Sequence, residues 1–137
     1  MIETHAIRLR GPWECQSEAA ELRRVSMPAS LREAAGEDRH GRLICRRRFG
    51  CPTCLDPHER VWMVVDCPSL SGEARLNGEP LGQIRGRSNT VEFELTGRLA
   101  ERNQFELVFD LGAAAAGDAS TVSDELLFAD VRLEIRG

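Results

Sequence analysis

The chain has 137 residues, of which 42% are hydrophobic and 29% are charged, and its net charge is −4. These values are typical of one globular domain spanning residues 1–137, and they exclude a wholly disordered chain. The length is too small for a TIM barrel, which needs about 250 residues. The negative charge argues against nucleic acid as a partner.

Short runs in which apolar and polar residues alternate predict half-buried β-strands, because a strand repeats every two residues. In the first run, Ile7, Leu9, Gly11 and Trp13 share one face, so we expect a single strand there with Trp13 in the core. The second run is weak, and in total we expect about eight strands. In chain order the runs span residues 7–13, 24–27, 43–49, 60–66, 72–76, 79–84, 91–95, 105–111 and 129–135.

Two local signals predict how the chain turns between these runs. Ser30 and Glu33 form a capping-box pattern, which predicts a short helical turn that stops near Gly36. Asn77 and Gly78 lie between two extended runs and tolerate the positive φ of a type I′ turn, so they predict a tight hairpin.

Almost no amphipathic helical pattern separates the runs, which argues against a parallel α/β fold. The sequence therefore predicts an all-β protein, an antiparallel jelly-roll β-sandwich. Phe93, Leu107 and Leu133 are expected in one core. Residues 112–123 are rich in Gly, Ala and Ser and are predicted to form an exposed loop.

A succession of short motifs covers nearly the whole chain. Its members are Gly11-Pro12-Trp13-Glu14, Val25-Ser26-Met27-Pro28, Cys45-Arg46-Arg47-Arg48-Phe49, Arg60-Val61-Trp62-Met63, Ala74-Arg75-Leu76-Asn77-Gly78-Glu79-Pro80-Leu81-Gly82, Val91-Glu92-Phe93-Glu94-Leu95-Thr96 with Leu99 and Arg102-Asn103, and Leu127-Phe128-Ala129-Asp130-Val131-Arg132-Leu133-Glu134. Their order and spacing resemble the N-terminal sugar-binding-type jelly roll of glycoside hydrolase family 2, a branch of the galactose-binding-domain-like fold. One departure is Cys45, which stands where that family usually has an aromatic residue.

The resemblance implies an architecture before it implies an activity. In that family this domain flanks a catalytic barrel, and the catalytic carboxylates lie in the barrel. The resemblance therefore implies a non-catalytic accessory module and assigns no catalytic residue to this chain. The sequence itself carries no recognisable nucleophile, metalloprotease or phosphate-loop motif, so we expect neither an enzyme nor a cofactor.

Trp62, Arg46 and Arg48 are the candidate ligand-binding residues. Trp62 alternates with Met63 and its apolar neighbours, so it falls on the outer face, where an indole can stack on a sugar ring or fill a partner's pocket. Cover from another segment of the same chain is the alternative for Trp62. Arg46 and Arg48 share the face opposite Phe49, and pairing with surface glutamates is their alternative.

Five cysteines are an odd number, so internal disulfides cannot use all of them. Cys51 and Cys54 form a CxxC pair, with His58 and Cys67 beyond it, but no second pair completes a typical zinc site. We interpret the cysteines as free thiols and keep a metal site in this loop as a minor alternative. No signal-peptide or membrane-spanning run is present, which favours the cytoplasm and argues against a membrane partner.

Two main functional hypotheses follow. The first is a non-catalytic carbohydrate-binding or accessory module, and the second is a protein-interaction or scaffold domain, including a self-associating homodimer. Sugar binding predicts an open groove with an aromatic ring and several hydrogen-bonding side chains. A protein interface predicts a flat apolar patch, which Trp62 and Val64 would begin.

Overall fold

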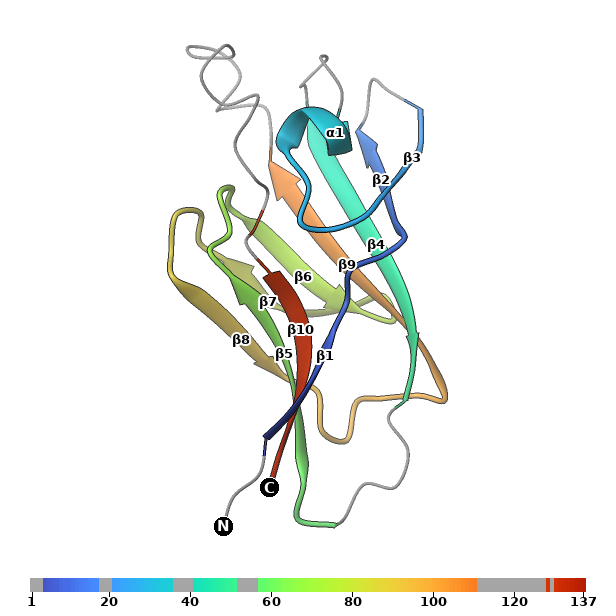
Figure 1. Cartoon of the computed structure of the whole chain (residues 1–137), viewed down its shortest axis with the longest axis vertical. Helices are drawn as coiled ribbons and strands as arrows, with labels where there is room; N and C mark the ends of the chain where they lie inside the picture. Colours follow the sequence, from blue (N-terminus) through green and yellow to red (C-terminus); the bar gives the residue numbers. More distant parts are fainter. Residues whose placement is uncertain (1–3, 18–20, 36–40, 52–56, 111–127, 129) are drawn as a thin grey trace.

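The computed structural model describes residues 4–17, 21–35, 41–51, 57–110, 128 and 130–137. Two antiparallel sheets lie face to face, with a short helix at one end of the sandwich (Figure 1). One sheet has the strand order β1-β10-β5-β8, formed by Thr4–Arg8, Asp130–Arg136, Arg60–Asp66 and Thr90–Glu94. The other has the order β3-β2-β4-β9-β6-β7, formed by Arg23–Val25, Trp13–Ser17, Arg42–Gly50, Arg102–Asp110, Gly72–Leu76 and Glu79–Ile84. The helix α1 spans Leu31–Ala35.

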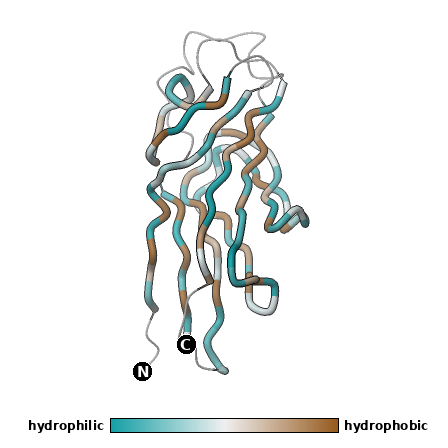
Figure 2. The backbone as a smooth tube through the Cα atoms, turned by 90° about the vertical axis from the view of Figure 1, so that its right-hand side faces the viewer, coloured by the Kyte–Doolittle hydropathy of each residue, from teal (hydrophilic) through white to brown (hydrophobic). Residues whose placement is uncertain are grey.

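The predicted all-β sandwich is confirmed, and alternating hydropathy explains it. Hydrophobic and hydrophilic residues alternate along the strands (Figure 2), so each sheet turns one face inward. Phe93, Leu107 and Leu133 belong to one buried cluster, as predicted. Trp13 is fully buried, where its ring packs against Phe105 and Phe128 at centroid distances of 6.2 and 5.8 Å. The core therefore lies between the two sheets.

The prediction of a single strand over residues 7–13 is wrong. The chain forms β1 in the four-stranded sheet, leaves it after Arg8, and enters the six-stranded sheet as β2 at Trp13. Leu9 and Trp13 are both buried, and the Trp13 indole N–H donates to the Leu9 carbonyl at 2.7 Å across the crossing. Ile7, which shared their alternation, is 45% exposed because it lies on an edge strand. The described residues therefore form ten strands instead of about eight.

The local turn signals are confirmed. Asn77 and Gly78 have φ values of 53° and 84° and connect β6 to β7. The Glu33 amide donates to the Ser30 hydroxyl at 3.1 Å, and the Glu33 carboxylate accepts from the Ser30 amide at 3.3 Å. The predicted stop at Gly36 and the predicted loop over residues 112–123 lie outside the described residues.

Two glycines permit close approaches within the fold. A Cβ at Gly72 would lie 2.0 Å from the Val108 carbonyl oxygen, so no other residue fits where β6 begins beside β9. A Cβ at Gly82 would lie 3.0 Å from the Phe93 ring, and its absence lets that ring pack beneath β7. Within the described residues, no helix is long and apolar enough to span a membrane.

Candidate ligand-binding cavity

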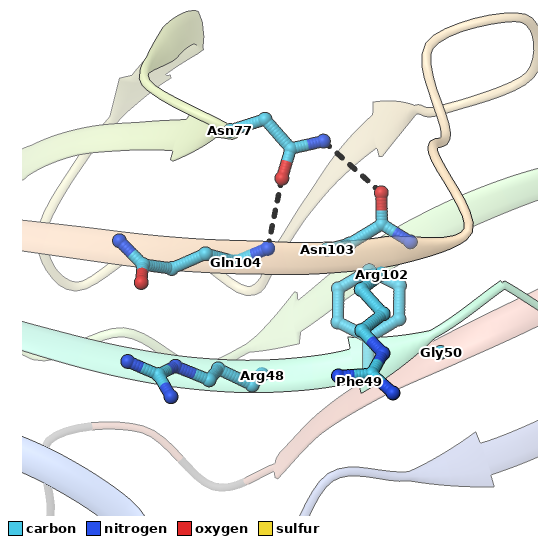
Figure 3. Close-up of a pocket in the computed structure, with 7 residues that line it drawn as sticks. All are labelled: Arg48, Phe49, Gly50, Asn77, Arg102, Asn103 and Gln104. Carbon is cyan, nitrogen blue, oxygen red and sulfur yellow. Dashed lines mark hydrogen bonds between the residues drawn. The ribbon is translucent and has the colours of Figure 1, made fainter.

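A cavity of about 580 Å³ lies where β4 ends and β9 begins, beside the turn between β6 and β7. Its volume is within the range of small-molecule sites, about 300–1,000 Å³. We call it the Arg48 cavity, and Figure 3 shows its lining residues. These are Arg48, Phe49, Gly50, Asn77, Arg102, Asn103 and Gln104.

Two asparagines fix the hairpin turn against β9. The Asn77 side-chain oxygen accepts a hydrogen bond from the backbone N–H of Gln104 at 2.9 Å. The Asn77 side-chain amino group donates to the Asn103 side-chain oxygen at 3.0 Å (Figure 3). Asn103 is buried and also exchanges two 2.9 Å hydrogen bonds with the backbone of Ala100. A buried amide bonded in this way, as Asn103 is, holds one geometry, so this side of the cavity is preorganised.

The charge of the cavity follows from the register of β4 and β9. Arg46 lies opposite Glu106, and the two side chains form an ion pair at 2.8 Å. Two residues further along the same face, Arg48 lies opposite the neutral Gln104. Within the described part of the chain, neither Arg48 nor Arg102 has a carboxylate partner. The cavity lining contains two arginines and no carboxylate.

The lining offers the groups that bind polar, ring-shaped ligands. Arg48 and Arg102 are exposed and supply forked N–H donors, which suit carboxylates and vicinal hydroxyl groups. Gln104 is half-buried and supplies both a donor and an acceptor. Phe49 also lines the cavity and is half-buried, with its ring packed against the core. An anionic or polyhydroxylated small molecule fits this set best.

The three residues predicted to bind ligand do not lie together. Arg48 lines the cavity, whereas Arg46 is held by Glu106 further along the sheet. Trp62 lies on the outer face of the other sheet, as predicted, and is half-buried beneath the Arg136 guanidinium, which lies 4.9 Å from its ring centroid. This cation–π contact comes from the neighbouring strand β10. Whether Trp62, Arg46 or Arg48 contacts a ligand stays a prediction.

The outer face around Trp62 is covered by ion pairs instead of forming an apolar patch. Val64 is fully buried, although it points away from the sandwich core, because it lies between Arg132 and Glu92 of the neighbouring strands. Among the described residues, the large hydrophobic side chains that are exposed are Ile7 and Leu22. The ion pairs on this face are Arg132 with Asp66, Asp130 and Glu134, Arg136 with Glu92 and Glu134, and Arg60 with Glu94.

A second cavity, of about 660 Å³, lies beside Arg132, where the chain crosses from one sheet to the other after β1. Its lining includes Arg132, whose guanidinium is already bound to Asp66 and to Asp130, the latter at 3.0 Å. The lining also contains Arg8 and Arg10, so three arginines lie beside two carboxylates, and those carboxylates would repel an anion. The Arg48 cavity is therefore the better candidate for ligand binding.

The CxxC loop is only partly described. Cys51 is half-buried just after β4, Cys67 is exposed, and Cys54 lies outside the described residues. Within the residues that the structure covers, no three His, Cys, Asp or Glu side chains are grouped as a metal site would require. The metal alternative stays a prediction, which elemental analysis of the pure protein would test.

Of the seven lining residues, only Arg48 was predicted from sequence to bind ligand, and Arg102, Asn103 and Gln104 of β9 were missed. Their role depends on which β4 residue each one faces, and the sequence does not show that pairing. Asn77 was predicted only as a turn residue, because the Asn-Gly signal is local.

Comparison with solved structures agrees with this fold. The chain superposes on an FMN-binding β-glucuronidase from Facaelibacterium prausnitzii L2-6 with a TM-score of 0.76 and 16% identity, covering 96% of this chain and 22% of that one. For a β-D-glucuronidase from Dictyoglomus thermophilum the TM-score is 0.74 at 16% identity, and the match covers 96% of this chain and 28% of that one. For a β-glycosidase from Bacteroides vulgatus the TM-score is 0.71 at 18% identity, and the match covers 96% of this chain and 20% of that one.

This chain thus spans between a fifth and three tenths of the glycosidases that it matches. No family model matches the chain. No curated protein matches it either. The resemblance to the N-terminal sugar-binding-type jelly roll of family 2 glycoside hydrolases is confirmed as a resemblance of fold. The chain shares its fold with part of each of these glycosidases.

Proposed function

We propose that this protein is a non-catalytic β-sandwich module that binds carbohydrate through the Arg48 cavity. The observation that carries the proposal is the composition of that cavity. It combines two guanidinium groups that have no carboxylate partner among the described residues, an aromatic ring and asparagine side chains fixed by hydrogen bonds. The fold shared with glycosidases supports a carbohydrate ligand over other polar molecules.

The charge of the cavity sets the class of sugar. Arg48 and Arg102 can each bind a carboxylate through two parallel hydrogen bonds, which are stronger than bonds to a neutral hydroxyl group. Gln104 can bind ring hydroxyl groups, and Phe49 can contact the apolar face of the ring. We therefore expect sugars that carry a carboxylate, such as hexuronates, to bind more tightly than the corresponding neutral hexoses.

The same lining supports a non-catalytic role. Glycoside hydrolysis ordinarily needs two carboxyl groups, about 5–9.5 Å apart, on either side of the scissile bond. The Arg48 cavity is lined by no Asp or Glu. The pure protein is therefore expected to release no product from a panel of aryl glycosides. Turnover that a point mutation abolishes would overturn this part of the proposal.

A glycan array followed by calorimetry tests sugar binding. The array should include matched neutral and acidic glycans, and we expect signals from the acidic ones. The double variant Arg48→Ala/Arg102→Ala should weaken binding at least about tenfold, since it removes both charged hydrogen-bond donors. Arg32→Ala is the matched control, because Arg32 is an exposed arginine on α1, at the opposite end of β4 (Figure 1). Absence of binding to every glycan, or equal binding by the double variant, would refute the proposal.

A further inference from the structure

Two buried cysteines face each other across neighbouring strands of the six-stranded sheet. Cys15 of β2 is the direct register partner of Cys45 of β4, and both side chains are fully buried. The Cys15 thiol donates a hydrogen bond to the Cys45 sulfur, at an S···S separation of 3.4 Å. Opposed residues of an antiparallel pair have Cα atoms about 4.5–5.5 Å apart, which falls within the range of disulfide-bonded cysteines.

The surroundings of the pair are apolar. The same inward-facing row continues across β9 and β6 with Leu107 and Ala74, both fully buried. The hydrogen bond with Cys15, and then burial, raise the pKa of the Cys45 thiol well above its ordinary value. Because the thiolate is the reactive form, the Cys45 thiol is unreactive while the sheet is closed, and full burial keeps reagents from both sulfurs. Oxidation therefore has to accompany folding or a transient opening of β2 from β4.

We propose that Cys15 and Cys45 are a modification site, where a cross-strand disulfide forms when the chain folds in the presence of a low-molecular-weight disulfide. The Cys15 and Cys45 S–H bonds break and one S–S bond forms between the two sulfurs. The oxidant's own S–S bond is reduced, and the two protons end on its two thiols. The backbone needs no rearrangement, since the sheet register already places the sulfurs together.

The bond would join the second strand of the six-stranded sheet to the third. β2 carries the edge strand β3, and β4 continues toward the Arg48 cavity. The two cysteines are 30 residues apart in sequence, so the disulfide would close a loop of that length. Closing such a loop restricts the unfolded chain and raises the melting temperature by roughly 10 °C for a domain of this size.

The test uses a variant in which Cys51, Cys54 and Cys67 are replaced by serine, which leaves only the proposed pair. The reduced, unfolded protein is refolded in a mixture of oxidised and reduced glutathione. We expect a loss of two free thiols, a mass decrease of two hydrogens, and a peptide map linking residue 15 to residue 45. The melting temperature should rise and return to its reduced value on addition of dithiothreitol.

The matched control carries the additional change Cys45→Ala, which keeps Cys15 in the same environment but removes its partner. It should gain no internal disulfide and no increase in melting temperature. If the serine variant does not fold, peptide mapping of the refolded wild-type protein reads the same pair directly. Folded protein that keeps both thiols free at every glutathione ratio, or that carries glutathione on them instead, would overturn the proposal.

Discussion

Asn77 shows how one side chain connects a turn to the candidate site. It has a positive φ in the β6–β7 turn and holds Gln104 and Asn103 through its side chain. Asn77→Gly keeps the φ accessible but removes both hydrogen bonds, so it should lower the free energy of unfolding by about 1–3 kcal/mol. Asn77→Ala should cost about 1 kcal/mol more, because alanine is strained at positive φ.

Urea denaturation of the two variants measures these differences. Asn89→Ala is a suitable control, because Asn89 is exposed and accepts its hydrogen bond from Cys67 through the backbone carbonyl, which the change retains. Wild-type stability of Asn77→Gly would show that the asparagine contributes only its backbone conformation.

Trp62 is a second residue whose role can be measured directly. The structure places Arg136 over its ring, and a cation–π contact at a partly exposed site contributes about 0.5–1 kcal/mol. Trp62→Ala should therefore leave the protein folded with a small loss of stability by thermal melting. If Trp62 instead anchors a partner, sedimentation should show association weakened by about 2 kcal/mol or more at nearly unchanged melting temperature.

At the scale of the strands, the inward faces carry the stability of the sandwich. Phe93 of β8, Leu107 of β9 and Leu133 of β10 are buried in one cluster that both sheets share. Replacing any of them by alanine should cost about 2–5 kcal/mol, through lost burial and a residual cavity. Val108→Ala is the control, because Val108 is the half-buried outer neighbour of Leu107. Wild-type-like denaturation midpoints for all three core variants would show that the assignment of faces is wrong.

The charged outer face of the four-stranded sheet gives stability a dependence on pH. Burial acts to raise the pKa of Glu134, but hydrogen bonds from Arg136 and Arg132 outweigh it and the pKa is lowered. A carboxylate whose pKa is lower in the folded state stabilises the fold above its unfolded pKa, about 4.3. That contribution is lost as the pH falls through the folded pKa.

Glu134→Gln should therefore reduce stability at pH 7 and flatten its decline between about pH 5 and 3. Denaturation midpoints measured across this range test the expectation. Glu79→Gln provides the comparison, since Glu79 is exposed and has no ion pair among the described residues. Identical pH profiles for Glu134→Gln and wild type would mean that the arginine network contributes nothing measurable.

At the scale of the whole molecule, the strands could be predicted from sequence because alternation is a local property. The crossing between β1 and β2 could not, since Leu9 and Trp13 face the same core from different sheets and so keep one alternating pattern. Arg48 was predicted as a ligand-binding residue, but the other residues of its cavity and the Cys15–Cys45 pair were missed. Both depend on strand register, which sets distant residues opposite each other and is fixed only by the complete sheet.

An NMR titration of the isotope-labelled protein tests the account most directly. The ligands are a hexuronate and the corresponding neutral hexose, added to the intact protein under identical conditions. Carbohydrate binding in the Arg48 cavity predicts that the hexuronate shifts the amide signals of Arg48, Phe49, Asn77, Arg102 and Gln104, with smaller effects from the hexose. Unchanged spectra with both sugars, or shifts confined to the outer face around Trp62, would contradict it.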